Sequence, residues 1–125
     1  MNRMAAALLL TLPLTAHAQD FSKEQICKAT IAVEMGRQTE GMAVVEGGDT
    51  PVISYRRADD GKRFTFGCKV SGNRVVWRGY FHDEKSWGRW RNDVNDAMVT
   101  FTSRGDELTI TSDMVGTKTF KHSQL

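Results

Sequence analysis

The sequence predicts an α+β fold in which one N-terminal helix packs on an antiparallel β-meander of six to seven strands. Three observations lead to this prediction. A helix-start signal surrounds Ser22, short alternating segments separated by turn residues follow from residue 42 onward, and the two cysteines, Cys27 and Cys68, lie in the predicted helix and in a predicted strand. A small curled β-barrel with a helix is the alternative architecture.

The helix is predicted from its two ends. Ser22 as N-cap and Gln25 three residues later form a capping box, and Phe21 can pack on Ile26 as a hydrophobic staple. Gly36 is placed to end the helix, because glycine readily adopts the left-handed conformation of a C-cap. Apolar side chains recur at helical spacing in between and predict one buried face.

The central strand is predicted at residues 63–70. Its side chains alternate between apolar and polar, which is typical of a strand buried on one face. Further strands are predicted at residues 42–46, 52–57, 74–81, 97–102, 107–111 and 118–122. Turn residues such as Asp60-Gly61 separate them. The predicted core comprises Ile53, Tyr55, Phe64, Phe66, Val70, Val75, Trp77, Val99, Phe101, Leu108, Ile110 and Phe120, with Ile26, Ala29, Thr30 and Val33 from the helix.

Cys27 and Cys68 are predicted to form one disulfide. A redox pair is disfavoured because there is no Cys-x-x-Cys motif, and two distant cysteines do not make a zinc site without further ligands. In the chain-entropy account, a bond closing a loop of about 40 residues stabilises the fold by roughly 3 to 4 kcal/mol. Such a bond implies an oxidising compartment.

The first residues have the three parts of a secretory signal peptide. Arg3 is basic, an apolar run follows, and Ala16-His17-Ala18 resembles a cleavage site. We therefore expect residues 1–18 to be a signal peptide and residues 19–125 to be a single globular domain, periplasmic or secreted. The apolar run is shorter than the roughly 20 residues of a membrane-spanning helix. No second apolar stretch in the sequence approaches that length, so the mature chain is expected not to span a membrane.

The charge of the chain is nearly balanced, with 17 basic and 15 acidic residues. Nucleic-acid-binding domains are usually clearly basic, so nucleic acid is not an expected partner. No metal motif, phosphate loop or dinucleotide fingerprint occurs, and we expect no cofactor and no metal.

The segment 77–91 is the strongest candidate for a binding surface, because it contains all three tryptophans and three arginines. These residue types dominate binding hot spots. The candidate binding residues are Tyr80, Trp87, Arg89, Trp90 and Arg91. In the alternative interpretation, the tryptophans at 87 and 90 fold back as a lid on the open end of the sheet, and the arginines pair with neighbouring carboxylates.

The sequence therefore predicts an exported, non-catalytic binding module, such as an inhibitor or immunity-type protein, that binds a protein or cell-envelope partner. No catalytic residue is assigned. One alternative is a structural accessory of an envelope complex. Another, weaker alternative is a small hydrolase of envelope polymers with Asp83 or Glu84 as acid or base.

Overall fold

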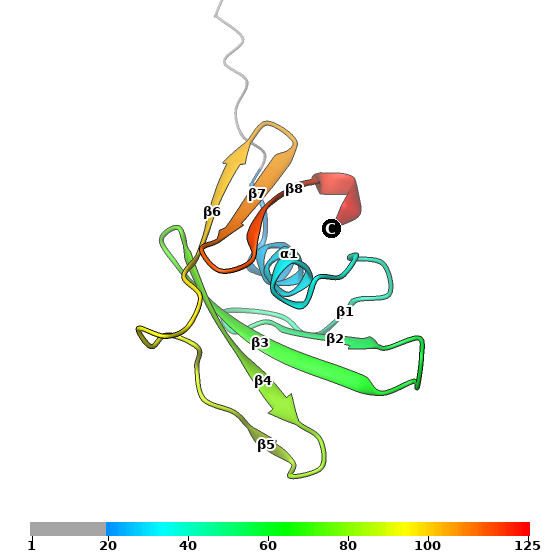
Figure 1. The fold of residues 1–125 in the computed structure, drawn as a ribbon. Coiled ribbons are helices and arrows are strands. Elements are labelled where there is room, and N and C mark those ends of the chain that lie inside the picture. The colour runs from blue at the N-terminus through cyan, green and yellow to red at the C-terminus, as the bar shows by residue number, and fades with distance from the viewer. Residues whose placement is uncertain (1–19) are drawn as a thin grey trace, which may run out of the picture.

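The computed structural model describes residues 20–125, so the predicted signal peptide lies outside the described residues. One helix packs against one antiparallel sheet, as predicted (Figure 1). The elements are α1 (Lys23–Met35), β1 (Ala43–Glu46), β2 (Val52–Arg56), β3 (Arg63–Ser71), β4 (Arg74–Phe81), β5 (Ser86–Trp87), β6 (Val99–Arg104), β7 (Glu107–Ser112), β8 (Gly116–Lys121) and the 3-10 helix η1 (His122–Gln124).

The sheet curls around the helix as a half-barrel. Its strand order is β1-β2-β3-β4-β6-β7-β8, with β5 paired to the free side of β4. The curl occurs where β4 changes partner, because Val75 lies opposite Val99 of β6 while Tyr80 lies opposite Trp87 of β5. Figure 1 shows α1 inside the curl, between the β1 to β5 region and the β6 to β8 region. The fold thus has the predicted meander order and also the curl of the barrel alternative.

The helix begins and ends at the predicted residues. The Ser22 hydroxyl accepts a hydrogen bond from the Gln25 amide at 3.1 Å, and the Gln25 side chain accepts one from the Ser22 amide at 2.9 Å. Gly36 ends the helix in the left-handed region with φ of 61°. The buried face includes Ile31, which widens the predicted apolar stripe, and also Ala32, because the curled sheet contacts the helix from β2, β3, β7 and β8.

The disulfide Cys27–Cys68 is present and joins the helix to the central strand. The two Cα atoms are 5.7 Å apart, and both side chains are fully buried. The bond therefore fixes α1 against the concave face of β3.

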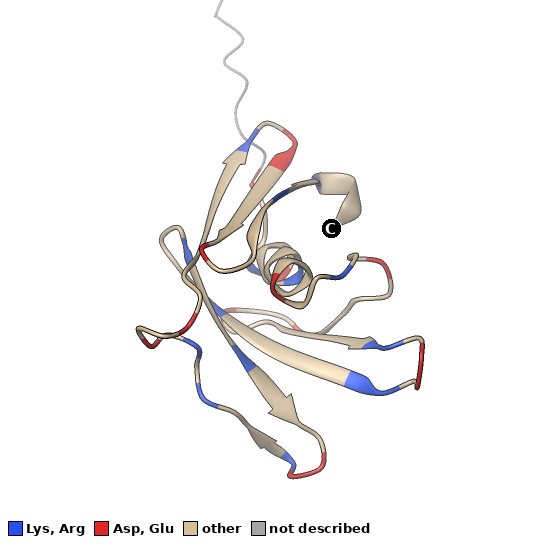
Figure 2. Ribbon diagram, in the orientation of Figure 1, with Lys and Arg blue, Asp and Glu red and all other residues tan. Residues whose placement is uncertain are grey.

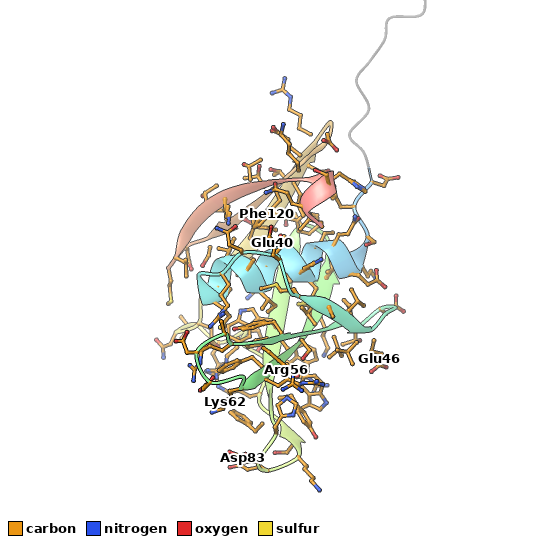
Figure 3. The ribbon with its side chains drawn as sticks, turned by 90° about the vertical axis from the view of Figure 1, so that its right-hand side faces the viewer. Glu40, Glu46, Arg56, Lys62, Asp83 and Phe120 are labelled. Carbon is orange, nitrogen blue, oxygen red and sulfur yellow. A yellow bond between two sulfur atoms is a disulfide. The ribbon has the colours of Figure 1, made fainter. Side chains whose placement is uncertain are left out.

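The predicted core residues all pack together on this concave face. Four of them, Phe64, Val70, Trp77 and Phe101, are only partly buried. For Phe64 and Trp77 the reason is the direction of the helix. Figure 1 and Figure 3 show α1 crossing β3 and β4, so the helix covers the part of the hairpin near Cys68 and leaves the end that begins at Arg63 uncovered. Phe64 lies at this uncovered end, and Trp77, opposite Cys68, borders it.

Two expectations about local structure are wrong. The sequence of residues 82–96 has no period and predicts no regular structure, but Ser86–Trp87 forms a short strand on β4. Two residues are too few to show a period in the sequence. The last strand was expected to reach His122, but β8 ends at Lys121 and the chain continues as η1. No helix among residues 20–125 is long and apolar enough to cross a membrane.

Candidate functional site

Two of the predicted binding residues, Trp87 and Trp90, lie on the convex face of the β3–β4 hairpin. There, aromatic and basic side chains stack in one row, which we call the outer ladder. Its members in order are Lys69, Trp90, Arg78, Trp87 and Tyr80. The cation-to-ring distances are 4.1 Å, 4.3 Å and 4.4 Å along the first three steps, and the rings of the last two residues are 5.1 Å apart.

The register of β3 and β4 builds the outer ladder. Arg78 lies opposite Gly67, and Tyr80 lies opposite Thr65, so both side chains point to the convex face. A Cβ atom on Gly67 would lie 3.4 Å from the ring of Trp87, which shows how closely that ring approaches the sheet. The absence of a side chain at this position lets the indole lie against the backbone.

The segment 86–91 runs along β4 beyond the two residues of β5. The Gly88 amide donates to the Gly79 carbonyl at 2.7 Å, and the Arg91 amide donates to the Trp77 carbonyl at 2.8 Å. Backbone groups on the free side of β4 are therefore hydrogen-bonded well past the regular pairing. This pairing places Trp87 and Trp90 on one face of the hairpin and carries Arg91 to the other.

Arg89 is engaged in an ion pair inside the same loop. Its guanidinium contacts both carboxylate oxygens of Asp96, at 2.6 Å and 2.9 Å. Asp96 also accepts a hydrogen bond from the Asp93 amide. These contacts, with the Arg89 hydrogen bond first in importance, lower the pKa of Asp96 to about 2. The alternative expectation that arginines pair with neighbouring carboxylates thus describes Arg89 well.

A second feature lies on the concave face, past the end of α1. It is a hollow of about 430 Å³ between the β2–β3 and β4–β5 turns, which we call the aromatic hollow. Its lining consists of Met35, Lys62, Arg63, Phe64, Thr65, Phe66, Trp77, Gly79, Tyr80, Phe81, His82, Asp83, Glu84 and Arg91.

The hollow exists because the aromatic stripe of β3 and β4 continues beyond the helix. The Phe66 and Trp77 rings meet edge to face at 5.8 Å, and Phe81 at the rim is 49% exposed. Gly79 lies between Trp77 and Phe81 along β4 and contributes no side chain to fill the space. The helix, which covers the rest of the concave face, ends at Met35 on the edge of the hollow.

Basic side chains lie over the rings of this region. The Lys62 ammonium is 5.7 Å from the centre of the Phe64 ring, and the Arg91 guanidinium is 5.7 Å from that of Trp77. The neighbouring Tyr55 ring, which stacks on Phe64, is faced by Arg37 at 4.7 Å. Three rings at or beside the hollow therefore each have a cation on one side.

The five predicted binding residues do not form one site. Arg91 contributes only to the lining of the aromatic hollow, and Trp87 and Trp90 belong only to the outer ladder, whereas Tyr80 is the last member of the ladder and also borders the hollow. Phe64, Phe66 and Trp77 are predicted core residues, so the hollow is not expected from the sequence. Where α1 crosses the hairpin leaves no signal in the sequence.

The polar groups near the hollow form a short chain on the convex side. His82 Nε2 and Thr65 Oγ1 are 2.8 Å apart, and Thr65 Oγ1 donates to Ser54 Oγ at 3.2 Å. No carboxylate is hydrogen-bonded to His82 within residues 20–125, and Asp83 and Glu84 are exposed on the turn. In the same part of the chain, no three His, Cys, Asp or Glu side chains are grouped so that they could hold a metal ion.

No protein-family model matches the chain, and comparisons with curated proteins and with solved structures give no match either. The outer ladder and the aromatic hollow are therefore the structural features from which a function can be inferred.

Proposed function

We propose that this protein is an exported, non-catalytic binding module that takes an apolar group of a protein partner into the aromatic hollow. The observation that supports this most directly is the incomplete burial of aromatic residues around an open space. Phe81 is 49% exposed, and Phe64 and Trp77 are only partly buried although they continue the core.

Covering these rings would be favourable. Fully burying a side chain the size of phenylalanine contributes roughly 1.5 to 3 kcal/mol, and aromatic residues in pockets often dominate binding energy. The hollow is open on one side and has the size of one or two large side chains. An inhibitor or immunity-type protein would use it to hold a projecting residue of its target.

The outer ladder is less suited to this role. The rings of Trp87 and Trp90 are already faced by Arg78, and Trp90 is also faced by Lys69. We assign the ladder to holding the segment 86–91 on β4. That segment carries Arg91, which lines the hollow. The ladder on the convex face therefore helps to position a residue of the proposed site on the concave face.

Export is part of the proposal and is supported by two features of the chain. Residues 1–18 have the pattern of a signal peptide, and the disulfide Cys27–Cys68 is compatible with an oxidising compartment. A structural accessory of an envelope complex would use the same hollow on a permanent partner. A hydrolase would need a sheltered acid, whereas Asp83 and Glu84 are exposed.

The test is photocrosslinking in cells that export the protein. A photoreactive phenylalanine analogue replaces Phe81 at the rim of the hollow or, as the matched control, Met114, which is 62% exposed on the β7–β8 turn. We expect one discrete crosslinked partner from position 81 and none from position 114. The partner should disappear when Trp77→Ala is added to the position 81 variant, provided that circular dichroism shows the fold intact. The same crosslinks from both positions, or none from 81, would contradict the proposal.

A further inference from the structure

We infer that the partner group entering the aromatic hollow belongs to an acidic peptide segment, in which a large apolar side chain is flanked by aspartate or glutamate. This inference rests on the proposed function and specifies the ligand of the same site. It follows from where the basic side chains lie relative to the aromatic rings.

A positively charged ligand is one possible occupant of an aromatic pocket. Ring faces attract cations, as in pockets for quaternary ammonium groups. Here Lys62 lies over Phe64, and Arg91 lies over Trp77. A positive ligand would have to enter beside two protein cations, and like charges close together repel each other. The hollow is therefore better matched to an apolar group that carries negative charge nearby.

Some of these basic side chains are also not paired with a carboxylate of the protein itself. Within residues 20–125, Lys62 and Arg37 form no ion pair. The carboxylate of Asp96 is 4.0 Å from the Arg91 guanidinium, which is beyond hydrogen-bond distance, and the Arg91 side chain is 40% exposed. A carboxylate on the ligand could approach this guanidinium more closely, and hydrogen bonds between charged groups are among the stronger ones.

The shape of the surface favours a chain over a single head group. A second hollow of about 400 Å³ adjoins the first at Met35, and its lining includes Arg37, Arg56 and Glu40. Together the two hollows make an elongated surface. The charged residues that line it are the basic Arg37, Arg56, Lys62, Arg63 and Arg91 and the acidic Glu40, Asp83 and Glu84.

The figures place this surface at one end of the molecule. Figure 2 shows basic segments at the facing ends of β2 and β3, with acidic segments on the β2–β3 and β4–β5 turns. Figure 3 shows Lys62, Arg56 and Asp83 on the opposite side of the helix from Phe120. An extended peptide could place its apolar side chain in the aromatic hollow and reach basic side chains on either side.

The experiment uses the exported, oxidised protein, labelled with nitrogen-15, and four blocked pentapeptides. They have phenylalanine between pairs of glutamate, glutamine or lysine, or alanine between pairs of glutamate. Binding is followed by NMR through the amide signals of Gly79 in the hollow and Gly105 in the β6–β7 turn, which lies at the other end of the molecule (Figure 1). At low salt, the glutamate–phenylalanine peptide should bind at least fivefold more tightly than the glutamine–phenylalanine peptide and should shift Gly79 but not Gly105.

Equal binding of the glutamate and glutamine peptides, or tighter binding of the lysine peptide than of the glutamate–phenylalanine peptide, would leave the proposed function intact and overturn the inference about charge. Equal binding of the alanine and phenylalanine peptides would show that the hollow is not used and would contradict both. If no peptide binds but the protein floats with phosphatidylglycerol vesicles and not with phosphatidylcholine vesicles, the negative charge belongs to a lipid and the peptide claim is wrong.

Two variants distinguish binding at the hollow from nonspecific attraction to the overall charge of the protein. Lys62→Gln should weaken the glutamate–phenylalanine peptide at least threefold. Arg104→Gln removes the same charge from the exposed β6–β7 hairpin and should leave binding unchanged. If both variants weaken binding equally, the attraction is nonspecific and the inference fails.

Discussion

Arg78 lies over the ring of Trp87, with 4.4 Å between the guanidinium carbon and the centre of the ring. Trp90 faces the same guanidinium at 4.3 Å. One planar cation thus holds two indoles that are three residues apart, and through them it holds the segment 86–91 along β4. Arg91 at the end of this segment lines the aromatic hollow on the other face. The six residues of the segment 86–91 therefore link the outer ladder on the convex face to the aromatic hollow on the concave face.

Arg78→Ala is expected to loosen this segment and to lower the free energy of unfolding by about 1 to 2 kcal/mol, since each cation–π contact contributes about 0.5 to 1 kcal/mol. Urea denaturation measures the loss, and acrylamide quenching of tryptophan fluorescence should increase. Arg104→Ala on the exposed β6–β7 hairpin is the control and should change neither quantity. An unchanged quenching constant for Arg78→Ala would show that the ladder does not hold the tryptophans.

Asp96→Asn should remove the ion pair with Arg89 and lower the thermal stability of the protein by an amount that depends on pH. The pKa of Asp96 is lowered to about 2 in the folded protein, against about 3.9 when unfolded, so its ionised form favours folding above about pH 4. That contribution is lost as the pH falls towards 2. The variant should therefore have a lower thermal midpoint than wild type at pH 7 and nearly the same midpoint at pH 2. A constant difference at all pH values would rule out the Arg89 ion pair as its source.

Glu34→Gln should have the opposite effect. Burial on the helix beside β7 raises the pKa of Glu34, and the Ser112 hydroxyl only partly offsets it. A raised carboxyl pKa means that the folded state loses stability as the pH rises through the unfolded pKa of about 4.3. The variant should melt at a higher temperature than wild type at pH 7, and the gain should vanish below about pH 4. Equal melting temperatures at pH 7 would show that Glu34 is adequately solvated.

Replacing both Cys27 and Cys68 with alanine should cost about 3 to 4 kcal/mol of unfolding free energy, because the bond closes a loop between residues 41 positions apart. Urea denaturation of the oxidised wild type and the double variant measures the difference. Reduction of the wild type with dithiothreitol should reproduce most of it. A loss below about 1 kcal/mol would mean that packing alone holds α1 on β3.

Much of this architecture follows from local patterns. Three of these patterns involve residues only a few positions apart: the capping box at Ser22, the glycine at residue 36 and the alternation along residues 63–70. Local hydrogen bonding and backbone geometry determine the conformation of such close neighbours. The disulfide was predictable as well, because the chain has only two cysteines. These features led to the helix, the meander and the composition of the core.

The candidate binding surface depended on relationships between distant residues. The aromatic residues Phe64 and Trp77 have the same pattern whether or not a helix covers them, and only the placement of α1 in the curl leaves them at an open hollow. The face on which Trp87 lies depends on its register opposite Tyr80. Two residues of pairing leave no periodic signal. Local propensities therefore determined the elements, and the direction in which α1 crosses the hairpin decided which apolar side chains are only partly buried.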